Sequence, residues 1–254
     1  MELVDDPDDP RLSDFIGLTD AQLRRSAFIV EGELAIRQLL RSAYPVRAVL
    51  LTEALFTRLA PALGDHPVYV ASRAVMRAVT GFDIHRGAVA SAARLPDPDP
   101  ASLLAAARQV AVLEGLNDHE NLGVLFRNAA AFGIDAVLLD PTCADPLYRR
   151  TVRVSLGHVL HVPFARLAPW PESLELIAES GFELVAMTPR GESVLSPRAA
   201  PRIAVLLGAE GPGLSEAALA AADVRVRIPM TDGVDSINVA TAAAIAFHAY
   251  HPAP

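Results

Sequence analysis

The stretch IAVLLGAEGPGLS, residues 203–215, determines the fold class of this 254-residue chain. Its first part, Ile203–Leu207, is entirely apolar, which is the pattern of a strand in a parallel sheet that helices cover on both faces. The glycine-rich turn Gly208–Gly213 follows directly, and Ser215 is placed to cap a helix that we expect to run to Ala222. Strand, turn and helix in this order predict an α/β fold.

The same alternation extends through the C-terminal part of the chain, residues 102–254. Short apolar runs predict strands at Gln109–Leu113, Ala136–Leu139, Val162–Phe164, Leu184–Met187 and Val224–Ile228. Helical patterns lie between and after them, at Asn121–Phe132, Thr151–Leu156, Ser173–Glu179 and Ser236–Tyr250. We therefore expect an α/β domain built on a parallel sheet.

A second, smaller α/β domain is predicted before a proline-rich linker. Its strands are expected at Val46–Leu51, Val68–Ala71 and Ala88–Ala92, and its helices near Asp20–Ala27 and at Glu33–Ser42, Glu53–Leu63 and Arg73–Thr80. Prolines at positions 96, 98 and 100 interrupt helix and strand, so we assign 96–101 to a linker. The predicted division is an acidic disordered tail at 1–12, a first domain at 13–95 and a second domain at 102–254.

Composition excludes several classes of chemistry. All 22 basic residues are arginine, so a P-loop and a lysine Schiff base are both excluded. Cys143 is the single cysteine, which excludes an internal disulfide and predicts a small apolar filler in a reducing, cytoplasmic compartment. No apolar run has the ~18 residues of a membrane span, so we expect a soluble protein. His158 and His161 have the spacing of a metal pair but lack a third ligand, and no metal is predicted.

Charge is unevenly distributed along the chain. The net charge of −8 argues against a general nucleic-acid binder. Residues 15–95, however, hold ten arginines against six acidic residues, whereas residues 1–14 hold six acidic residues against one arginine. This excess is small enough to arise by chance, but it makes the first domain the better candidate for contacts with an anionic partner.

Ligands of open α/β sheets bind beyond the carboxyl ends of the strands, and three loops there carry unusual residues. The first loop, 114–121, leads into the helix that carries Arg127, the second contains Glu210, and the third, 229–238, contains Ser236 and Asn238. Asn121, Ser236 and Asn238 could also be simple helix N-caps. Arg127 lies in an apolar helix and must reach water, a carboxylate or a phosphate.

Two other features leave alternatives open. Arg149, Arg150 and Arg153 could form a solvated helix face or contact phosphates. The glycine order of the turn at 208–213 is G-x-x-G-x-G, which differs from the G-x-G-x-x-G of nicotinamide-binding proteins. An oxidoreductase is therefore disfavoured.

Taken together, the three loops resemble the signatures of the SpoU-type RNA ribose 2′-O-methyltransferases of the SPOUT superfamily. The segments are NLGVLFRNAAAFG at 121–133, LGAEGPGLS at 207–215, and IPM at 228–230 followed by Gly233 and SINVA at 236–240. Phe28–Gly32 and His85–Gly87 resemble, less specifically, the ends of an L30e-like substrate-binding domain. Two departures are Ile237 in place of the usual leucine, and Asp118–Glu120 in place of a proline–glycine approach to Asn121.

The resemblance implies a fold, a cofactor and an assembly. The expected fold is a small L30e-like α/β/α domain followed by a SPOUT α/β domain with a parallel sheet and a deep trefoil knot, and the expected assembly is a homodimer whose active site draws on both subunits. The implied cofactor is S-adenosylmethionine. The resemblance assigns cofactor contacts to Leu207, Gly208, Ile228, Met230 and Ile237, and it assigns the reaction site to Asn121, Arg127, Glu210, Ser236 and Asn238.

The implied function is methyl transfer to a ribose 2′-hydroxyl in structured RNA, with 23S rRNA favoured because of the extra front domain. A tRNA substrate is the first alternative. The second is a non-catalytic RNA-binding or assembly factor with a vestigial cofactor site.

Overall fold

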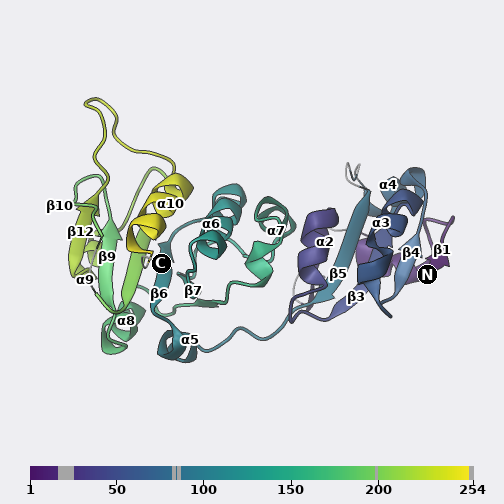
Figure 1. Cartoon of the computed structure of the whole chain (residues 1–254), viewed down its shortest axis with the longest axis horizontal. Helices are drawn as coiled ribbons and strands as arrows, with labels where there is room; N and C mark the ends of the chain where they lie inside the picture. Colours follow the sequence, from purple (N-terminus) through teal and green to yellow (C-terminus); the bar gives the residue numbers. More distant parts are fainter. Residues whose placement is uncertain (17–25, 82–83, 85–86, 198–199, 252–254) are drawn as a thin grey trace. The chain divides into compact units, whose positions relative to one another are not determined.

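The computed structural model describes residues 1–16, 26–81, 84, 87–197 and 200–251, and the chain divides into two compact units (Figure 1). The first unit contains Met1–Pro96 together with Pro146–His161, and the second contains Asp97–Asp145 together with Val162–Pro254. The helix predicted near residues 20–27 lies largely outside the described residues, as do His85 and Arg86 of the front motif.

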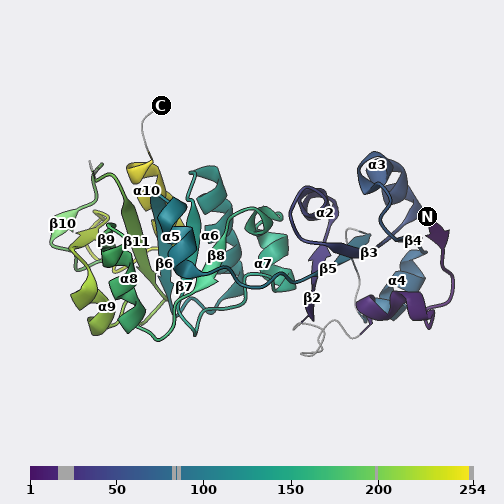
Figure 2. The ribbon, with the colours of Figure 1, turned by 90° about the horizontal axis from the view of Figure 1, so that it is seen from below.

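The first unit is a three-layer α/β/α sandwich (Figure 2). Its five strands, in sheet order, are β1 (Glu2–Leu3), β4 (Val68–Val70), β3 (Val46–Leu51), β5 (Ala88–Ala93) and β2 (Ala27–Glu31). Helices α2 (Glu33–Leu39) and α3 (Glu53–Leu63) cover one face, while the 3-10 helix η1 (Pro10–Phe15) and α4 (Arg73–Thr80) cover the other. The predicted α/β/α layering is confirmed.

The N-terminal residues correct one prediction. Residues 1–12 were predicted as a disordered tail, but β1 pairs in parallel with β4, and Leu12 and Phe15 have no exposed surface. Both side chains join a core cluster that includes Leu50 and Met76. Acidic residues and prolines dominate this segment, but its few apolar side chains are buried and are enough to fix it on the sheet.

The acidic residues of this segment are used as hydrogen-bond acceptors. Asp14 accepts from Ser91 Oγ at 2.9 Å and from Arg47 at 2.8 Å. Asp9 caps η1 and accepts hydrogen bonds from the side chain and backbone of Arg11, which lower the pKa of the Asp9 carboxyl to about 2. The negative charge of the N-terminus is therefore partly paired within the first unit.

Residues 146–161 belong to the first unit although they lie far along the chain. Helix α7 (Arg149–Val154) packs on β2, and the 3-10 helix η2 (His158–Leu160) packs on α2. The buried carboxylate of Glu31 accepts from Arg149 at 2.9 Å and from Arg153 at 3.3 Å. Two of the three arginines for which a solvated face or phosphate contacts were considered are thus paired internally.

The second unit contains a seven-stranded parallel sheet. In sheet order the strands are β10 (Ser193–Val194), β12 (Val224–Arg227), β9 (Glu183–Met187), β11 (Ile203–Gly208), β6 (Gln109–Glu114), β7 (Ala136–Leu139) and β8 (Phe164–Arg166). Each strand predicted in this region exists within about two residues of its expected bounds. The predicted parallel sheet is confirmed.

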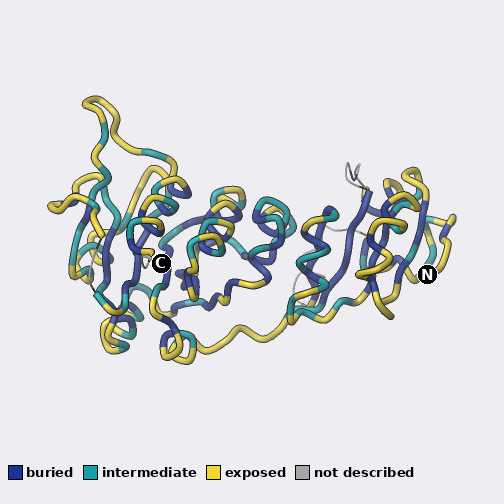
Figure 3. Tube along the Cα trace, in the orientation of Figure 1, coloured by how far each residue is buried: buried dark blue, intermediate teal, exposed yellow. Residues whose placement is uncertain are grey.

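Helices cover both faces of this sheet. Helices α5 (Pro100–Ala106), α8 (Glu175–Glu179) and α9 (Glu216–Ala221) pack on one face, around a cluster of alternate strand residues such as Val110 and Leu206. Helix α10 (Val239–Tyr250) packs against β11 and against α6 (His119–Ala131) on the other face. The sheet interiors are buried while the connecting loops are exposed (Figure 3).

Helix α5 was not predicted, because Pro100 was assigned to the linker. The structure places Pro100 in the first turn of α5, where proline is tolerated, and Asp99 caps the helix by accepting from Ser102 N–H. No helix in the described part of the chain is long and apolar enough to cross a membrane.

The strand order places a late strand between two earlier ones. Strand β10 lies within the connection from β9 to β11, yet β12 is inserted between β9 and β10. A Cβ built on Gly191 would lie 2.3 Å from the carbonyl carbon of Val226, so only glycine allows the two backbones to approach this closely. A knot formed by the final segment would require β12 at this position, and the knot itself stays a prediction.

We predict that Phe15→Ala lowers the free energy of unfolding by about 3–5 kcal/mol, because it removes a fully buried side chain from the first unit's core. Leu3→Ala is the matched control, since Leu3 lies in the same N-terminal segment with 75% of its surface exposed. Urea denaturation measures both variants. Equal stabilities for the two would show that the N-terminal segment does not pack as described.

Candidate active site at the carboxyl edge of the seven-stranded sheet

Three loops leave the carboxyl edge of the second unit's sheet, where ligands of parallel α/β sheets bind. One joins β6 to α6, one joins β11 to α9, and one joins β12 to α10. The third loop extends well beyond the sheet before returning to α10 (Figure 1), and most of its residues are exposed. All three loops are those in which the sequence predicted the site.

The side-chain amide of Asn238 joins three of the predicted residues. Its Nδ2 group donates to Asn121 Oδ1 at 2.8 Å and to Glu210 Oε1 at 2.6 Å. Its Oδ1 atom accepts from the backbone N–H groups of Ala240 and Thr241 at 3.0 and 3.2 Å. One amide therefore links the three loops and caps α10 at the same time.

Asn121 and Asn238 were both considered as simple helix N-caps, and the structure gives a different answer for each. Asn238 is the N-cap of α10. Asn121 is not a cap, because α6 begins two residues earlier and Asp118 Oδ1 accepts from the N–H groups of Glu120 and Asn121. Asp118, a departure from the family pattern, thus performs the capping and leaves the Asn121 side chain available to Asn238.

Arg127 and Ser236 do not join this cluster. Arg127 is exposed on α6 and has no hydrogen bond or ion pair with any described residue. Arg127 lies six positions after Asn121, which places the two side chains about 120° apart around a helix with ~3.6 residues per turn. Ser236 lies exposed in the third loop, two residues before Asn238.

The predicted cofactor residues lie at the bases of the second and third loops. Leu207 is buried, and a Cβ on Gly208 would lie 2.3 Å from the carbonyl carbon of Gly213, so the turn requires glycine there. Ile228, Met230 and Ile237 are half-buried. Within the described residues, the backbone N–H groups of Ile228 and Met230 have no hydrogen-bond partner, which leaves them free to bind a ligand.

The structure adds two residues that sequence reasoning did not single out. Asn128 Nδ2 donates to the carbonyl of Ala240 at 2.9 Å and ties α6 to the first turn of α10. Glu114, the last residue of β6, accepts hydrogen bonds from Trp170 and Ser215. A carboxylate at the end of a buried strand was the available signal for Glu114, because such a group needs partners.

The cysteine and histidine side chains considered for chemistry have environments that indicate a structural role. Burial, together with the neighbouring Asp140 carboxylate, raises the pKa of the Cys143 thiol to about 12, so the thiol is not a nucleophile at neutral pH. His161 Nε2 contacts the carbonyl of Gln38 at 3.1 Å. No group of three or more His, Cys, Asp or Glu side chains suited to a metal is found among the described residues.

Comparison of the sequence with known proteins identifies the family. The model of the SpoU rRNA Methylase family matches residues 108–248, which include all three loops. The chain belongs to this family. A Mycobacterium tuberculosis protein named as an uncharacterised tRNA/rRNA methyltransferase is 51% identical over 258 residues, covering 96% of this chain and 90% of that protein. The resemblance inferred from the three signatures is confirmed.

More distant members share the whole architecture. A 23S rRNA (guanosine(2553)-2′-O)-methyltransferase of Bacillus subtilis is 28% identical and covers 87% of each chain. A solved RNA 2′-O ribose methyltransferase is 27% identical, with a TM-score of 0.80 over 97% of this chain and 96% of that one. An AdoMet-bound rRNA methyltransferase from Sinorhizobium meliloti, 24% identical, has the same fold with a TM-score of 0.79 over 96% and 95% of the two chains.

The double role of Asn238 can be separated by substitution. Asn238→Ala removes the cap of α10 and should lower the free energy of unfolding by about 1 kcal/mol. Asn238→Ser keeps a capping oxygen but is too short to bridge Asn121 and Glu210, so its stability should stay close to that of the original chain. Urea unfolding of both variants tests this. Equal losses would mean that the bridge to Asn121 and Glu210, rather than the cap, supplies the stability.

Proposed function

We propose that the chain transfers a methyl group from S-adenosylmethionine to a ribose 2′-hydroxyl of structured RNA in the cytoplasm, with 23S rRNA as the favoured substrate. S-adenosylmethionine is the cofactor of this family. The observation that carries the proposal is the Asn238 bridge, which gathers residues of all three signatures at the edge where ligands bind. The rRNA preference is supported by the Bacillus subtilis relative, which matches both units of the chain.

The residues present fit the cofactor. The free N–H groups of Ile228 and Met230 and the backbone around Gly208 suit the polar edge of a nucleoside, while Leu207 and Ile237 offer apolar contacts. When bound, the cofactor supplies an electrophilic methyl group for in-line displacement. The chain's task is then largely to hold the 2′-hydroxyl in line with that methyl group.

Asn121, Glu210, Ser236 and Asn238 are proposed to orient the ribose. The hydroxyl must lose its proton as it attacks, so a proton acceptor has to lie nearby. Arginine stays protonated in proteins and is a poor base. We therefore assign Arg127 to the phosphate beside the target nucleotide, which its forked guanidinium suits.

A homodimer would bring Arg127 to the cluster from which it is separated within one chain. Val124, one helical turn before Arg127, is a 38% exposed apolar side chain on α6. Ile245 is equally exposed on the neighbouring helix α10. Exposed apolar residues on two packed helices, close to an unpaired arginine, support an interface in which each subunit supplies Arg127 to its partner's site.

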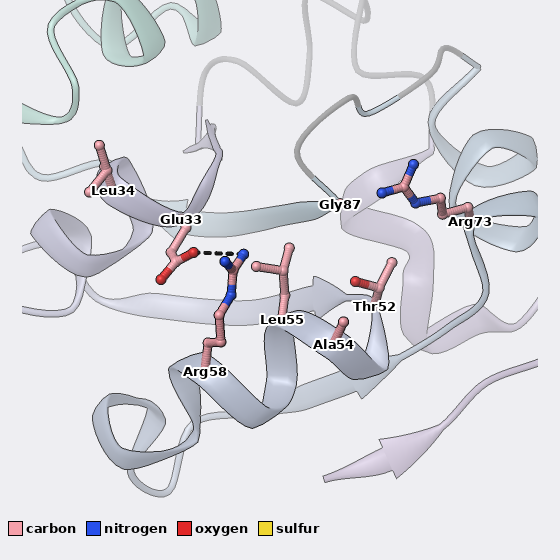
Figure 4. A pocket seen from close by; sticks show the side chains of 8 residues that line it. All are labelled: Glu33, Leu34, Thr52, Ala54, Leu55, Arg58, Arg73 and Gly87. Atoms are coloured by element: carbon pink, nitrogen blue, oxygen red, sulfur yellow. Dashed lines mark ion pairs between the residues drawn. The ribbon is translucent and has the colours of Figure 1, made fainter.

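The first unit is proposed to bind the RNA away from the reacting ribose. It contains a pocket of about 380 Å³ lined by residues of α2 and α3 and by Gly87, which precedes β5 (Figure 4). Arg58 lines the pocket and pairs with Glu33 at 2.9 Å, while the exposed Arg73 reaches toward it from the start of α4. Two guanidinium groups at a pocket of this size suit an unstacked nucleotide and its phosphate.

Experiments can distinguish the proposed function from two alternatives, a tRNA substrate and a non-catalytic role. A tRNA substrate would give methyl transfer to tRNA transcripts and none to 23S rRNA. A non-catalytic assembly factor would show no saturable binding of S-adenosylmethionine in calorimetry. A tritiated-methyl assay with unmodified 23S rRNA and tRNA transcripts therefore tests the proposed function directly.

Arg127→Ala should lower the methylation rate at least about a hundredfold on a proven substrate, because it removes the charge proposed to hold the reacting phosphate. Arg108→Ala is the matched control. Arg108 is also exposed in the second unit, but it lies at the amino end of β6, on the opposite edge of the sheet. Full activity of Arg127→Ala would overturn its assignment to the site.

Mixing variants tests the shared active site in the same assay. Arg127→Ala and Asn238→Ala should each be weakly active alone. If each site takes Arg127 from one subunit and Asn238 from the other, mixed dimers contain one intact site and recover part of the activity. No recovery after subunit exchange has been verified would place both residues of a site on one chain.

Arg73→Ala should weaken RNA binding and reduce the slope of log affinity against log salt by about 1, since one phosphate contact is lost. Arg77→Ala, one turn later on α4 and outside the pocket lining, should leave the slope unchanged. Filter binding between about 50 and 200 mM salt measures both. Equal slopes for the two variants would remove the pocket from the RNA-binding surface.

A further inference from the structure

The side chain of Glu114 connects three loops of the second unit. Its Oε1 atom accepts from Trp170 Nε1 at 2.8 Å and from Ser215 Oγ at 2.7 Å, and its Oε2 atom accepts from the Ser215 backbone N–H at 2.8 Å. Glu114 ends β6, Trp170 follows β8, and Ser215 ends the glycine-rich turn after β11. This side chain is half-buried and accepts three hydrogen bonds, so both carboxylate oxygens have donors.

Both ends of the glycine-rich turn are attached to this one residue. Gly208, where the turn begins, is paired with Glu114 in the β6–β11 ladder, and Ser215, where it ends, is held by the Glu114 carboxylate. Between them, Gly213 N–H donates to the carbonyl of Ala209 at 3.0 Å and closes the turn. Glu210 lies inside the closed turn and accepts from Asn238. The position of the Glu210 carboxylate therefore depends on how the turn is held.

The chemistry of these contacts requires both an acceptor at 114 and a hydroxyl at 215. All three partners of Glu114 are donors, so a glutamine would direct an N–H group at another N–H or O–H group. The Ser215 hydroxyl donates to Glu114 while its oxygen accepts from Ala218 N–H at 3.1 Å and caps α9. An alanine at 215 would lose both contacts, and an aspartate would place two carboxylates together.

We infer that Glu114 is a positioning residue, which fixes the glycine-rich turn so that Gly208 faces the cofactor and Glu210 faces the ribose; this rests on the proposed function. Glu114 itself touches neither reactant. Its effect passes through Ser215 to the turn. Glu114 lies outside the five residues assigned to the reaction site and the five assigned to the cofactor.

The test is calorimetric titration of the full chain with S-adenosylmethionine. Glu114→Gln should raise the Kd at least about tenfold, because loss of charged hydrogen bonds frees the turn. Ser215→Ala should raise it similarly, and the double variant should be no worse than either single one, because both act through the same link. Fully additive effects, or an unchanged Kd in Glu114→Gln, would overturn the inference.

Two further measurements separate positioning from general stability. Arg202→Met is the matched control, since Arg202 binds the carbonyls of Ala107 and Ser180 at 2.9 and 2.6 Å at the amino end of β11. It should lower the denaturation midpoint without changing the Kd. Hydrogen exchange of the backbone amides at 209–211 and 213–215 should quicken in Glu114→Gln and not in Arg202→Met. If Arg202→Met raised the Kd as much as Glu114→Gln, Glu114 would affect binding only through the stability of the fold.

The same titration distinguishes the two proposals. If the original chain shows no saturable binding of S-adenosylmethionine, the proposed function fails. If the original chain binds and Glu114→Gln binds equally well, only the positioning role fails. The exchange of the amides at 209–211 and 213–215 is measured without cofactor, so it reports on the turn in either case.

Discussion

The insertion of β12 between β9 and β10 is the constraint on which the second unit depends. It forces the backbone of Gly191 against Val226, a contact that any side chain would prevent. Because β12 runs parallel to its neighbours, its carboxyl end emerges at the same edge as those of β6 and β11. Three loops that are far apart in the sequence thereby meet at one place, and the candidate site exists only there.

The site is assembled from contacts that each serve more than one purpose. Asn238 caps α10 and bridges Asn121 and Glu210, and Ser215 caps α9 and binds Glu114. Asp118 caps α6, so the Asn121 side chain is available to bind Asn238. Helix ends need such partners for their N–H groups in any case. Placing three capped helix starts at the edge of a sheet therefore supplies most of the polar groups of the site from the ordinary requirements of the fold.

The sequence predicted the helices and strands better than it predicted which elements and side chains contact one another. Strands such as Ile203–Leu207 were predicted correctly because a short, unbroken apolar run next to turn residues is typical of a buried strand. Asn121, Glu210 and Asn238 were found because the three signatures occur in order, and the structure brings these three together. The separate position of Arg127 was not predicted, although its spacing of six positions from Asn121 on one helix implies it.

Other features depend on long-range pairing that local patterns do not contain. The insertion of β12 follows from sheet order alone, and Leu12 and Phe15 look like part of a charged tail until the surface that they cover is known. The role of Glu114 depends on Ser215, about a hundred residues later in the chain. Arginines 149 and 153 likewise look like a solvated face until the buried Glu31 is placed beside them.

The docking of α7 on Glu31 has a practical consequence for dissecting the protein. Neither unit is a continuous segment, because the chain returns to the first unit at Pro146 and leaves it again after His161. A fragment ending at Pro96 would retain the Glu31 carboxylate and lose both arginines that neutralise it. Isolating the first unit intact therefore requires residues 146–161 to be grafted back onto the N-terminal fragment, because a single cut after Pro96 does not separate the two units.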